Sequence, residues 1–426
     1  MMTASEQDSV RDPGSAPGPI VAGPGRTTSA RRVAMAGIAL CALLAACTGG
    51  APRDASSFPT DVGQPSTTHP SPRQTPPQPT PMPVDPFPVG PALGAPGAVE
   101  DVVTDVVTPW GVAFLPSGAA VVTLRDPAEV LMVSADGVRT LDGPGADDLE
   151  ATTDRTGEGG LLGIARSPDF LDDRLVYLYR STASANQVVR AVLDPDGTLG
   201  PLQLVLDGIP HASFHDGGRL AFGPDGFLYV TTGDAGVRSS SQDQDSLGGK
   251  ILRLTAAGEP APGNPVEGSP VWSLGHRNVQ GIGWDSTGRM FASEFGQNTW
   301  DELNVIVPGG NYGWPLIEGT AGRAGYLDPV VTWRTEDASP SGLAVTPGGV
   351  LLAALRGERL WQVPLQGAQV GTPVVALDGL GRLRDVVQAP DGALWVLTSN
   401  RDGRGDPRTG DDRILRLAGP GGAAGT

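Results

Sequence analysis

A short unit recurs six times between residues 115 and 400, and it constrains the fold of this chain more than any other feature. Each copy has a turn, in most copies rich in glycine, followed by an apolar, strand-forming stretch. Examples are LPSGAAVVTL at 115–124, GPDGFLYVTTGD at 223–234 and APDGALWVLTSN at 389–400. The turns lie 43 to 62 residues apart, at Pro116, Pro168, Pro224, Ser286, Pro347 and Pro390.

Self-similarity at this spacing, with Gly-rich turns, is typical of β-propellers, in which each repeat supplies one small sheet. Six copies predict an all-β fold, a six-bladed β-propeller. Glycine supplies the positive φ that each turn needs, and the strand after it is expected to alternate between core and exposed faces. Loops from every blade meet at one end of a propeller's channel. Polar clusters beside different repeats should therefore converge there, although about a hundred residues separate them.

The N-terminus, residues 1–46, is interpreted as a lipoprotein signal peptide and not as part of the fold. Arg31 and Arg32 precede an apolar run at 33–46 that is shorter than the ~20 residues needed to span a bilayer. The sequence LAAC at 44–47 fits the lipobox of bacterial lipoproteins, in which Cys47 is acylated after cleavage. This predicts an extracytoplasmic protein, lipid-anchored to the cell membrane. The alternatives are a plain secretory signal and a short membrane anchor.

Residues 47–93 are rich in proline and poor in large apolar side chains, which predicts an extended tether. The propeller domain is then expected to occupy residues 94–426. The whole chain has 30 Lys and Arg against 47 Asp and Glu, a formal net charge of −17. This sign argues against nucleic acid as a partner. An acidic exterior suits solubility and divalent cations.

Two polar clusters carry residue types suited to proton transfer. The first, HDGGR at 215–219, contains His215, which could act as a general base near neutral pH. Asp234 follows the next strand and could orient this imidazole. The second cluster, GHRN at 275–278, contains His276, which is expected to be structural and to bond to backbone. Arg219 is as well explained by an ion pair between blades as by a role in the site.

Four arginines indicate an anionic ligand, because guanidinium groups form two parallel bonds to a carboxylate. They are Arg277, Arg356, Arg382 and Arg384. Arg382 and Arg384 are expected on one face of a strand, with no carboxylate between them, as a cationic platform that needs an anion. The alternative is pairing with Asp385 or with a neighbouring blade. The loop at 294–298 offers carbonyl and side-chain oxygens suited to Ca²⁺.

Seven strings, in this order and spacing, resemble the soluble quinoprotein sugar dehydrogenases, the glucose/aldose dehydrogenases that depend on pyrroloquinoline quinone (PQQ). They are PWGVAFLPSG, EGGLLGIARSPDF, HDGGRLAFGPDGFLYVTTGD, LGGKILRL, GHRNVQG, SEFGQNTWDELNVIVPGGNYGWP and RLRDVVQAPDGALWVLT. The resemblance covers residues 105–417. It implies a six-bladed propeller that binds PQQ and Ca²⁺ over its channel. The implied enzyme oxidises the C1 hydroxyl of an aldose sugar to a lactone and passes electrons to an external acceptor.

The resemblance also implies roles for individual residues. His215 resembles the base that takes the sugar C1 hydroxyl proton while hydride moves to PQQ, and Asp234 resembles its orienting carboxylate. Arg277 resembles the arginine beside the reactive quinone carbonyl, and Asn278 resembles another cofactor contact.

Further matching positions concern the metal and the carboxylates of PQQ. Gly296 and Gln297 resemble the loop whose backbone carbonyls bind the catalytic Ca²⁺. Arg382 and Arg384 resemble the arginines that hold the PQQ carboxylates.

Two positions in the expected cofactor site depart from the family pattern. Arg356 stands where the best-known members have lysine, which keeps the charge but changes the geometry. Glu158 stands where those members have a neutral amide, so it would bring a carboxylate close to an anionic cofactor.

Two other functions are compatible with the sequence. A non-catalytic extracellular propeller could bind a glycan or a protein. A Ca²⁺-dependent lactonase could use the same architecture, but it would need metal-ligating carboxylates that point into the channel, for which Glu158 and Glu294 are the candidates.

Overall fold

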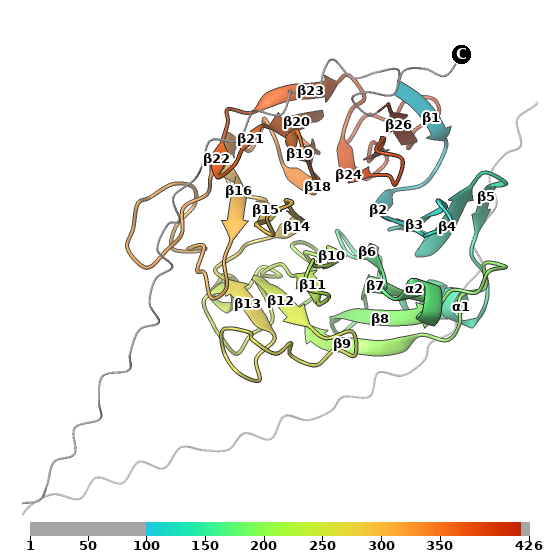
Figure 1. Cartoon of the computed structure of the whole chain (residues 1–426), viewed down its shortest axis with the longest axis horizontal. Helices are drawn as coiled ribbons and strands as arrows, with labels where there is room; N and C mark the ends of the chain where they lie inside the picture. The colour runs from blue at the N-terminus through green and yellow to red at the C-terminus, as the bar shows by residue number, and fades with distance from the viewer. Residues whose placement is uncertain (1–98, 419–426) are drawn as a thin grey trace, which may run out of the picture. The chain divides into compact units, whose positions relative to one another are not determined.

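The computed structural model describes residues 99–418, which form six four-stranded antiparallel sheets arranged around one axis (Figure 1). The first three sheets, from the innermost strand outward, are β2 (Pro109–Phe114), β3 (Ala120–Leu124), β4 (Glu129–Ser134), β5 (Gly137–Thr140); β6 (Leu161–Arg166), β7 (Leu175–Ser181), β8 (Asn186–Val192), β9 (Gln203–Ile209); and β10 (Leu220–Phe222), β11 (Leu228–Thr231), β12 (Lys250–Leu254), β13 (Val271–Leu274). The next two are β14 (Val279–Trp284), β15 (Met290–Glu294), β16 (Trp300–Ile306), β17 (Val331–Arg334); and β18 (Pro340–Thr346), β19 (Gly349–Ala354), β20 (Arg359–Val363), β23 (Val374–Asp378). A small hairpin of β21 (Leu365–Gln366) and β22 (Gln369–Val370) interrupts the fifth sheet.

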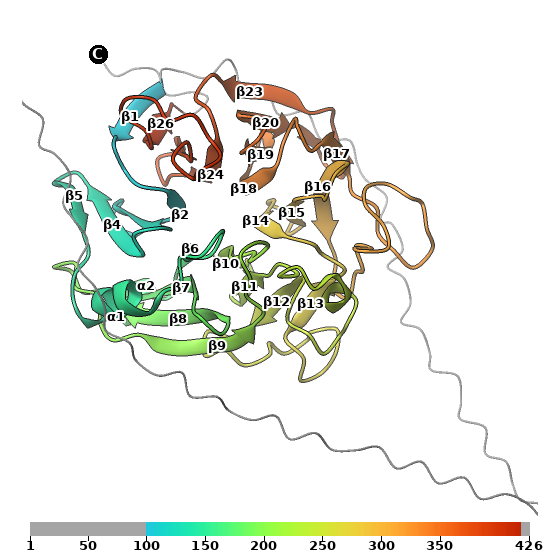
Figure 2. The same ribbon diagram turned by 180° about the vertical axis from the view of Figure 1, so that it is seen from behind.

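The sixth sheet joins the two ends of the described chain. Its strands β24 (Leu383–Gln388), β25 (Leu394–Thr398) and β26 (Ile414–Leu417) come last in the sequence, whereas its outer strand is β1 (Val99–Val103). Because β1 pairs with β26, the first strand of the described chain completes the sheet formed by the last three strands and so closes the ring (Figure 2). The prediction of an all-β, six-bladed propeller is confirmed.

The repeat turns join the innermost strand of each sheet to the second strand. Glycine takes a positive φ in five of these turns, for example Gly118 at 87° and Gly226 at 79°. In the second sheet the short helix α2 (Phe170–Asp173) is inserted, and Arg174 takes the left-handed conformation instead.

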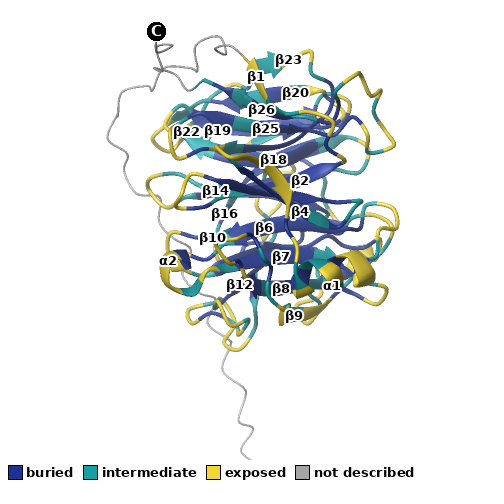
Figure 3. Cartoon of the chain, turned by 90° about the vertical axis from the view of Figure 1, so that its right-hand side faces the viewer, coloured by how far each residue is buried: buried dark blue, intermediate teal, exposed yellow. Residues whose placement is uncertain are grey.

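The second strands do not alternate between buried and exposed residues, so that expectation was wrong. β3 and β19 are buried along their whole lengths. The reason is that each sheet is packed between two others. Six apolar clusters fill the six interfaces between neighbouring sheets, and one of them joins Val121 of β3 to Leu178 of β7. Figure 3 shows the buried strands stacked in layers, with exposed residues mainly in the loops and outer strands.

Helices contribute little to this part of the chain. Besides α2, the structure has α1 (Pro144–Thr152) and a 3-10 turn, η1 (Arg238–Ser241). None of the helices within residues 99–418 has the length and apolar character needed to cross a bilayer. The predicted signal peptide, Cys47 and the tether lie outside the described residues.

Candidate active site

His215 lies in the loop between β9 and β10, with its backbone in the left-handed region at φ 63°. Its amide N–H donates to Glu158 Oε2 at 3.0 Å. Gly217, two residues later, also has a positive φ, and a Cβ there would lie 2.6 Å from the backbone of Thr232. The Gly-Gly pair after His215 therefore lets the loop pass against the neighbouring strand and present the imidazole at the end of the channel.

His215 forms the predicted pair with Asp234. The two atoms, His215 Nδ1 and Asp234 Oδ1, are 2.7 Å apart, and the carboxylate is buried. Asp234 also accepts hydrogen bonds from the Gly236 amide and from Trp314 Nε1. Burial alone would raise the pKa of Asp234, but these hydrogen bonds, led by that from His215, lower it below its usual value. An ionised Asp234 keeps the proton on Nδ1, which leaves Nε2 of His215 as an acceptor.

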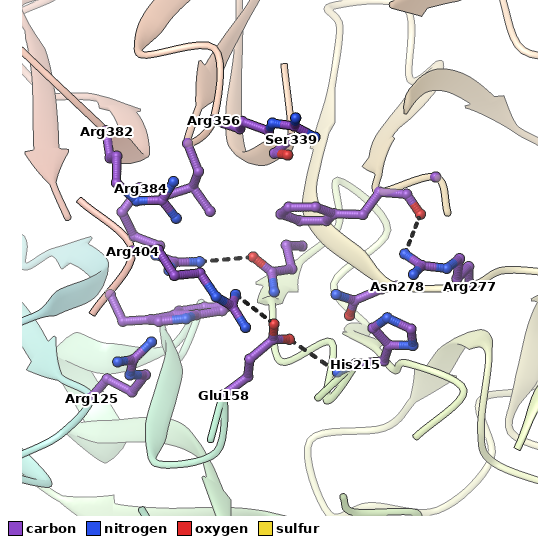
Figure 4. A pocket seen from close by; sticks show the side chains of 15 residues that line it. Arg125, Glu158, His215, Arg277, Asn278, Ser339, Arg356, Arg382, Arg384 and Arg404 are labelled. Carbon is purple, nitrogen blue, oxygen red and sulfur yellow. Dashed lines mark hydrogen bonds and ion pairs between the residues drawn. The ribbon is translucent and has the colours of Figure 1, made fainter. Parts of the chain in front are cut away.

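A cavity of about 420 Å³ lies beside His215 at the channel end (Figure 4). Its lining includes six arginines: Arg125, Arg277, Arg356, Arg382, Arg384 and Arg404. The four predicted arginines are thus brought together from three different sheets. Asn278, Gly296 and Glu158 also line the cavity, whereas Gln297 does not. The arrangement concentrates positive charge around a space that suits a small anion with several carboxylates.

The two arginines near the start of β24 have a carboxylate partner that the sequence did not reveal. Arg382 Nε and Nη2 donate to Asp402 Oδ2 at 3.0 and 2.8 Å, and Arg384 Nη2 lies 3.7 Å from the same oxygen. The expectation of a platform without a carboxylate was therefore wrong. Burial and the charge of Arg125 nevertheless lower the pKa of Arg384 to about 9, so one Asp402 does not satisfy the cluster. An anionic ligand would stabilise it.

Asp385 has a different partner, Arg219. The pair Arg219 Nη1–Asp385 Oδ2 measures 2.6 Å and joins the third sheet to the sixth, which lie opposite each other in the ring. Arg219 also stacks on Trp110, at 4.4 Å from the ring centroid. Since Trp110 lines the cavity and Arg219 does not, this ion pair supports the cavity instead of binding its occupant.

Arg277 and Asn278 connect β13 to β14 on the same side as His215. Asn278 Oδ1 accepts the Gly217 amide hydrogen bond at 3.0 Å, so Asn278 holds the His215 loop. Arg277 Nη1 donates to the Phe295 carbonyl, but its buried Nε has no partner within residues 99–418. Burial lowers the pKa of Arg277 despite the nearby charge of Asp234. An incompletely paired guanidinium beside His215 is suited to an anionic partner.

His276 is structural, as expected, but its partners are side chains and not backbone. Its Nδ1 lies 2.8 Å from Glu294 Oε2, and its Nε2 lies 2.8 Å from Ser273 Oγ. The ring is fully buried and stacks on Tyr312. Glu294 also accepts the Arg277 amide hydrogen bond, so its carboxylate is committed to holding the GHRN segment.

The predicted calcium loop has its amide groups turned toward a carboxylate. The N–H groups of Gln297 and of the next three residues all donate to Glu318 Oε1, at 2.9 to 3.1 Å. Gly296 N–H donates to Asp301 Oδ1. When successive N–H groups converge on one side, the carbonyls face the other, where oxygen donors suit Ca²⁺. Residues 99–418 contain no cluster of three or more His, Cys, Asp or Glu side chains that could hold a metal ion. A cation here would depend on backbone oxygens, and the metal site remains a prediction.

Comparison with known proteins places these features in one family. The family model described as glucose/sorbosone dehydrogenase matches residues 106–415. The chain belongs to this family. The solved structure of the PQQ-bound form of aldose sugar dehydrogenase from Streptomyces coelicolor is 52% identical, with a TM-score of 0.71, and the match covers 76% of this chain and 99% of that one.

Two curated relatives are more distant. The aldose sugar dehydrogenase of Escherichia coli is 31% identical over 332 residues, which cover 69% of this chain and 88% of the relative. Quinoprotein glucose dehydrogenase B of Acinetobacter calcoaceticus is 30% identical over 236 residues, 47% of this chain and 49% of that protein.

Sequence reasoning missed three charged residues of this glucose/sorbosone dehydrogenase-type site. Arg125 follows β3, and Asp402 and Arg404 lie in the loop between β25 and β26. The available signal for Arg404 was its place between two glycines, in the sequence RDGRG at 401–405. Nothing local indicates that this loop returns to the cavity, because its position depends on closure of the ring.

Proposed function

We propose that this protein oxidises the C1 hydroxyl of aldose sugars to lactones with PQQ as the hydride acceptor. The observation that carries the proposal is the His215–Asp234 pair, 2.7 Å apart, at the wall of a cavity lined by six arginines. An imidazole whose Nδ1 is held by a carboxylate suits proton abstraction from a hydroxyl group. The arginines suit a cofactor that bears several carboxylates. PQQ, when bound, would supply the two-electron oxidation that amino-acid side chains cannot perform.

In this proposal, each side chain near His215 has a separate role in the reaction. His215 Nε2 accepts the proton of the sugar hydroxyl, and Asp234 holds the ring and stabilises the imidazolium that forms. Arg277 supplies positive charge on the same side, where negative charge develops during the reaction. Trp314 and the Gly236 amide keep Asp234 in place.

The cofactor-binding residues would be Arg277, Asn278, Arg356, Arg382 and Arg384, with Glu158 at the edge of the cavity. Arg356 is exposed at the end of β19, and its guanidinium makes no ion pair within residues 99–418. The lysine-to-arginine departure therefore leaves a free cation at the cavity wall. The unpaired Nε of Arg277 likewise supports the binding of an anionic cofactor in this cavity.

Ca²⁺ is proposed to bind the carbonyl oxygens of Gly296 and Gln297. The support is the orientation of this loop, whose amide groups are used by Asp301 and Glu318. We further propose an extracytoplasmic location, with the chain anchored through acylated Cys47 and electrons passed to an external acceptor. The support for this is the lipobox and the Pro-rich tether in the sequence.

The lactonase alternative loses its two candidate ligands in this geometry. Glu158 is bonded to Arg404 and to the His215 amide, and Glu294 is bonded to His276 and to the Arg277 amide. The propeller that only binds a glycan or protein remains the competing hypothesis, and an activity assay separates it from the enzyme.

The test is to load the purified protein with PQQ and Ca²⁺ and to follow dye reduction with a panel of aldoses. We expect sugar-dependent bleaching that requires PQQ. Absence of bleaching with every aldose, in protein shown to be folded by circular dichroism, would contradict the proposal. Lactone hydrolysis without PQQ would favour the lactonase.

A further inference from the structure

Glu158 and Arg404 form an ion pair at the cavity wall, although 246 residues separate them in the sequence. Arg404 Nη1 lies 2.7 Å from Glu158 Oε1, and Figure 4 shows the arginine extending toward the carboxylate. Among the described residues that line the cavity, Glu158 alone carries a carboxylate. It is therefore a negative charge in a space whose other charged groups favour an anion.

The second oxygen of Glu158 holds the backbone of His215. Glu158 Oε2 accepts the His215 amide hydrogen bond at 3.0 Å. His215 has a positive φ, a conformation that side chains other than glycine adopt at a cost. The loop thus has two anchors, since Asp234 holds the ring and Glu158 holds the main chain. Burial raises the pKa of Glu158, but the hydrogen bonds from His215 and Arg404 outweigh it and keep the pKa below its usual value.

Arg404 is tied to the arginine cluster through its backbone. Its N–H donates to Asp402 Oδ1, while Asp402 Oδ2 pairs with Arg382. The Arg404 side chain is 62% exposed, and within residues 99–418 its guanidinium pairs with Glu158 alone. An ion pair this exposed contributes little to stability, because water screens the attraction and both side chains lose conformational freedom. Holding the fold together is therefore a poor explanation for the pair, and its position in the cavity is a better one.

We propose that Glu158 and Arg404 act as one unit, in which Glu158 is a positioning residue for His215 and Arg404 offsets the negative charge that Glu158 brings to the cofactor cavity. A carboxylate accepts the His215 hydrogen bond more strongly than a neutral amide does. Its charge would repel an anionic cofactor unless a cation lay beside it. The inference rests on the proposed function, because the cavity matters in this way only if it binds an anion such as PQQ.

A double-mutant cycle followed by calorimetric PQQ titration tests the charge balance. Arg404→Gln alone should weaken PQQ binding by about tenfold or more, the effect of one unbalanced charge a few ångströms away in a partly screened site. Adding Glu158→Gln should restore the affinity to within about threefold of the wild type, since the charge and its partner are removed together. Glu158→Gln alone should bind PQQ at least as tightly as the wild type.

Arg401→Gln is the matched control. It removes one positive charge from the same loop, but Arg401 points to Asp105 and does not line the cavity. Its PQQ affinity should stay within about threefold of the wild type.

The positioning role has its own readout, which is kcat at saturating PQQ. The amide oxygen of Glu158→Gln can still accept the His215 hydrogen bond, whereas Glu158→Ala cannot. We expect Glu158→Ala to turn over more slowly than Glu158→Gln, with circular dichroism melts showing that both are folded. Equal kcat values would overturn the positioning role.

The outcomes distinguish this inference from the proposed function. If the wild type binds PQQ but Arg404→Gln binds equally well, or the double variant binds as weakly as Arg404→Gln, the charge balance is wrong. If the wild type does not bind PQQ, the proposed function falls and takes this inference with it.

Discussion

The two sides of the cavity differ in how far their polar groups are satisfied. On the His215 side most polar groups are paired: Asp234 holds the imidazole, and Asn278, just before β14, holds Gly217, although Nε of Arg277 has no partner among the described residues. On the side of β19 and β24, arginines outnumber carboxylates, and Asp402 is shared between Arg382 and Arg384. The first side is preorganised for proton transfer. The second side has an excess of positive charge, which the proposed anionic cofactor would balance. Under the proposed function, one cavity therefore combines a formed His215–Asp234 pair with incompletely paired arginines that bind the cofactor.

The largest expected effect comes from removing the proposed base on the His215 side, which should lower turnover. His215→Gln should lower turnover by roughly 10²–10⁴-fold, the range for a lost general base, and leave PQQ affinity nearly unchanged. Dye reduction at saturating sugar and PQQ titration of the same preparation measure the two quantities. Wild-type turnover in this variant would remove His215 from the mechanism.

Removing an arginine on the side of β24 should weaken cofactor binding. Arg382→Ala and Arg384→Ala should each cost about 2–4 kcal/mol of PQQ affinity, because a charged pair loses one partner. The melting temperature should change little, since either variant leaves Asp402 with one arginine. A large fall in melting temperature at unchanged PQQ affinity would show instead that these arginines serve the fold.

A smaller effect is expected on the His215 side, where a buried carboxyl group should make the stability of the fold depend on pH. Glu302, on β16 behind Arg277, has its pKa raised to about 8, by burial first and by the charge of Glu294 second. The folded state then holds a proton that the unfolded state loses near pH 4.5, so unfolding free energy should fall as pH rises from about 4.5 to 8. Glu302→Gln should remove this loss.

Thermal melts at pH 5 and pH 8 measure this difference. The wild type should lose a few degrees more than Glu302→Gln between the two values, roughly the size of a 1–2 kcal/mol change. Asp234 has the opposite sign: its pKa is lowered, so its stabilisation is present above about pH 4 and disappears as pH falls below that. If the melting temperatures of the wild type and Glu302→Gln change equally with pH, the raised pKa of Glu302 is contradicted.

Much of the fold could be predicted from the sequence because it is encoded locally. The turn-and-strand unit identifies each sheet, and six units identify the ring. The pairing of β1 with β26 was not predicted, because β1 lies before the first repeat and carries no turn of its own. The burial of both faces of β3 was missed for a related reason, since it depends on neighbours that the repeat pattern does not name.

The site was predictable where chemistry and spacing coincide, as for His215 and Asp234. It was not predictable where a residue acts through a contact across the ring. Lys250, the only lysine in the sequence, is a separate case: it is buried and donates to the carbonyls of the nearby Ser240, Ser241 and Gly248. Burial lowers its pKa to about 8.

The most direct test of the account is a calorimetric titration of the purified wild-type protein with PQQ in the presence of Ca²⁺. The arginine wall predicts tight binding of one PQQ per chain, and the affinity should fall as salt is added, because charges attract the cofactor. Absence of binding at low salt, in protein that melts cooperatively, would contradict the claim that the arginines near β19 and β24 bind this anionic cofactor.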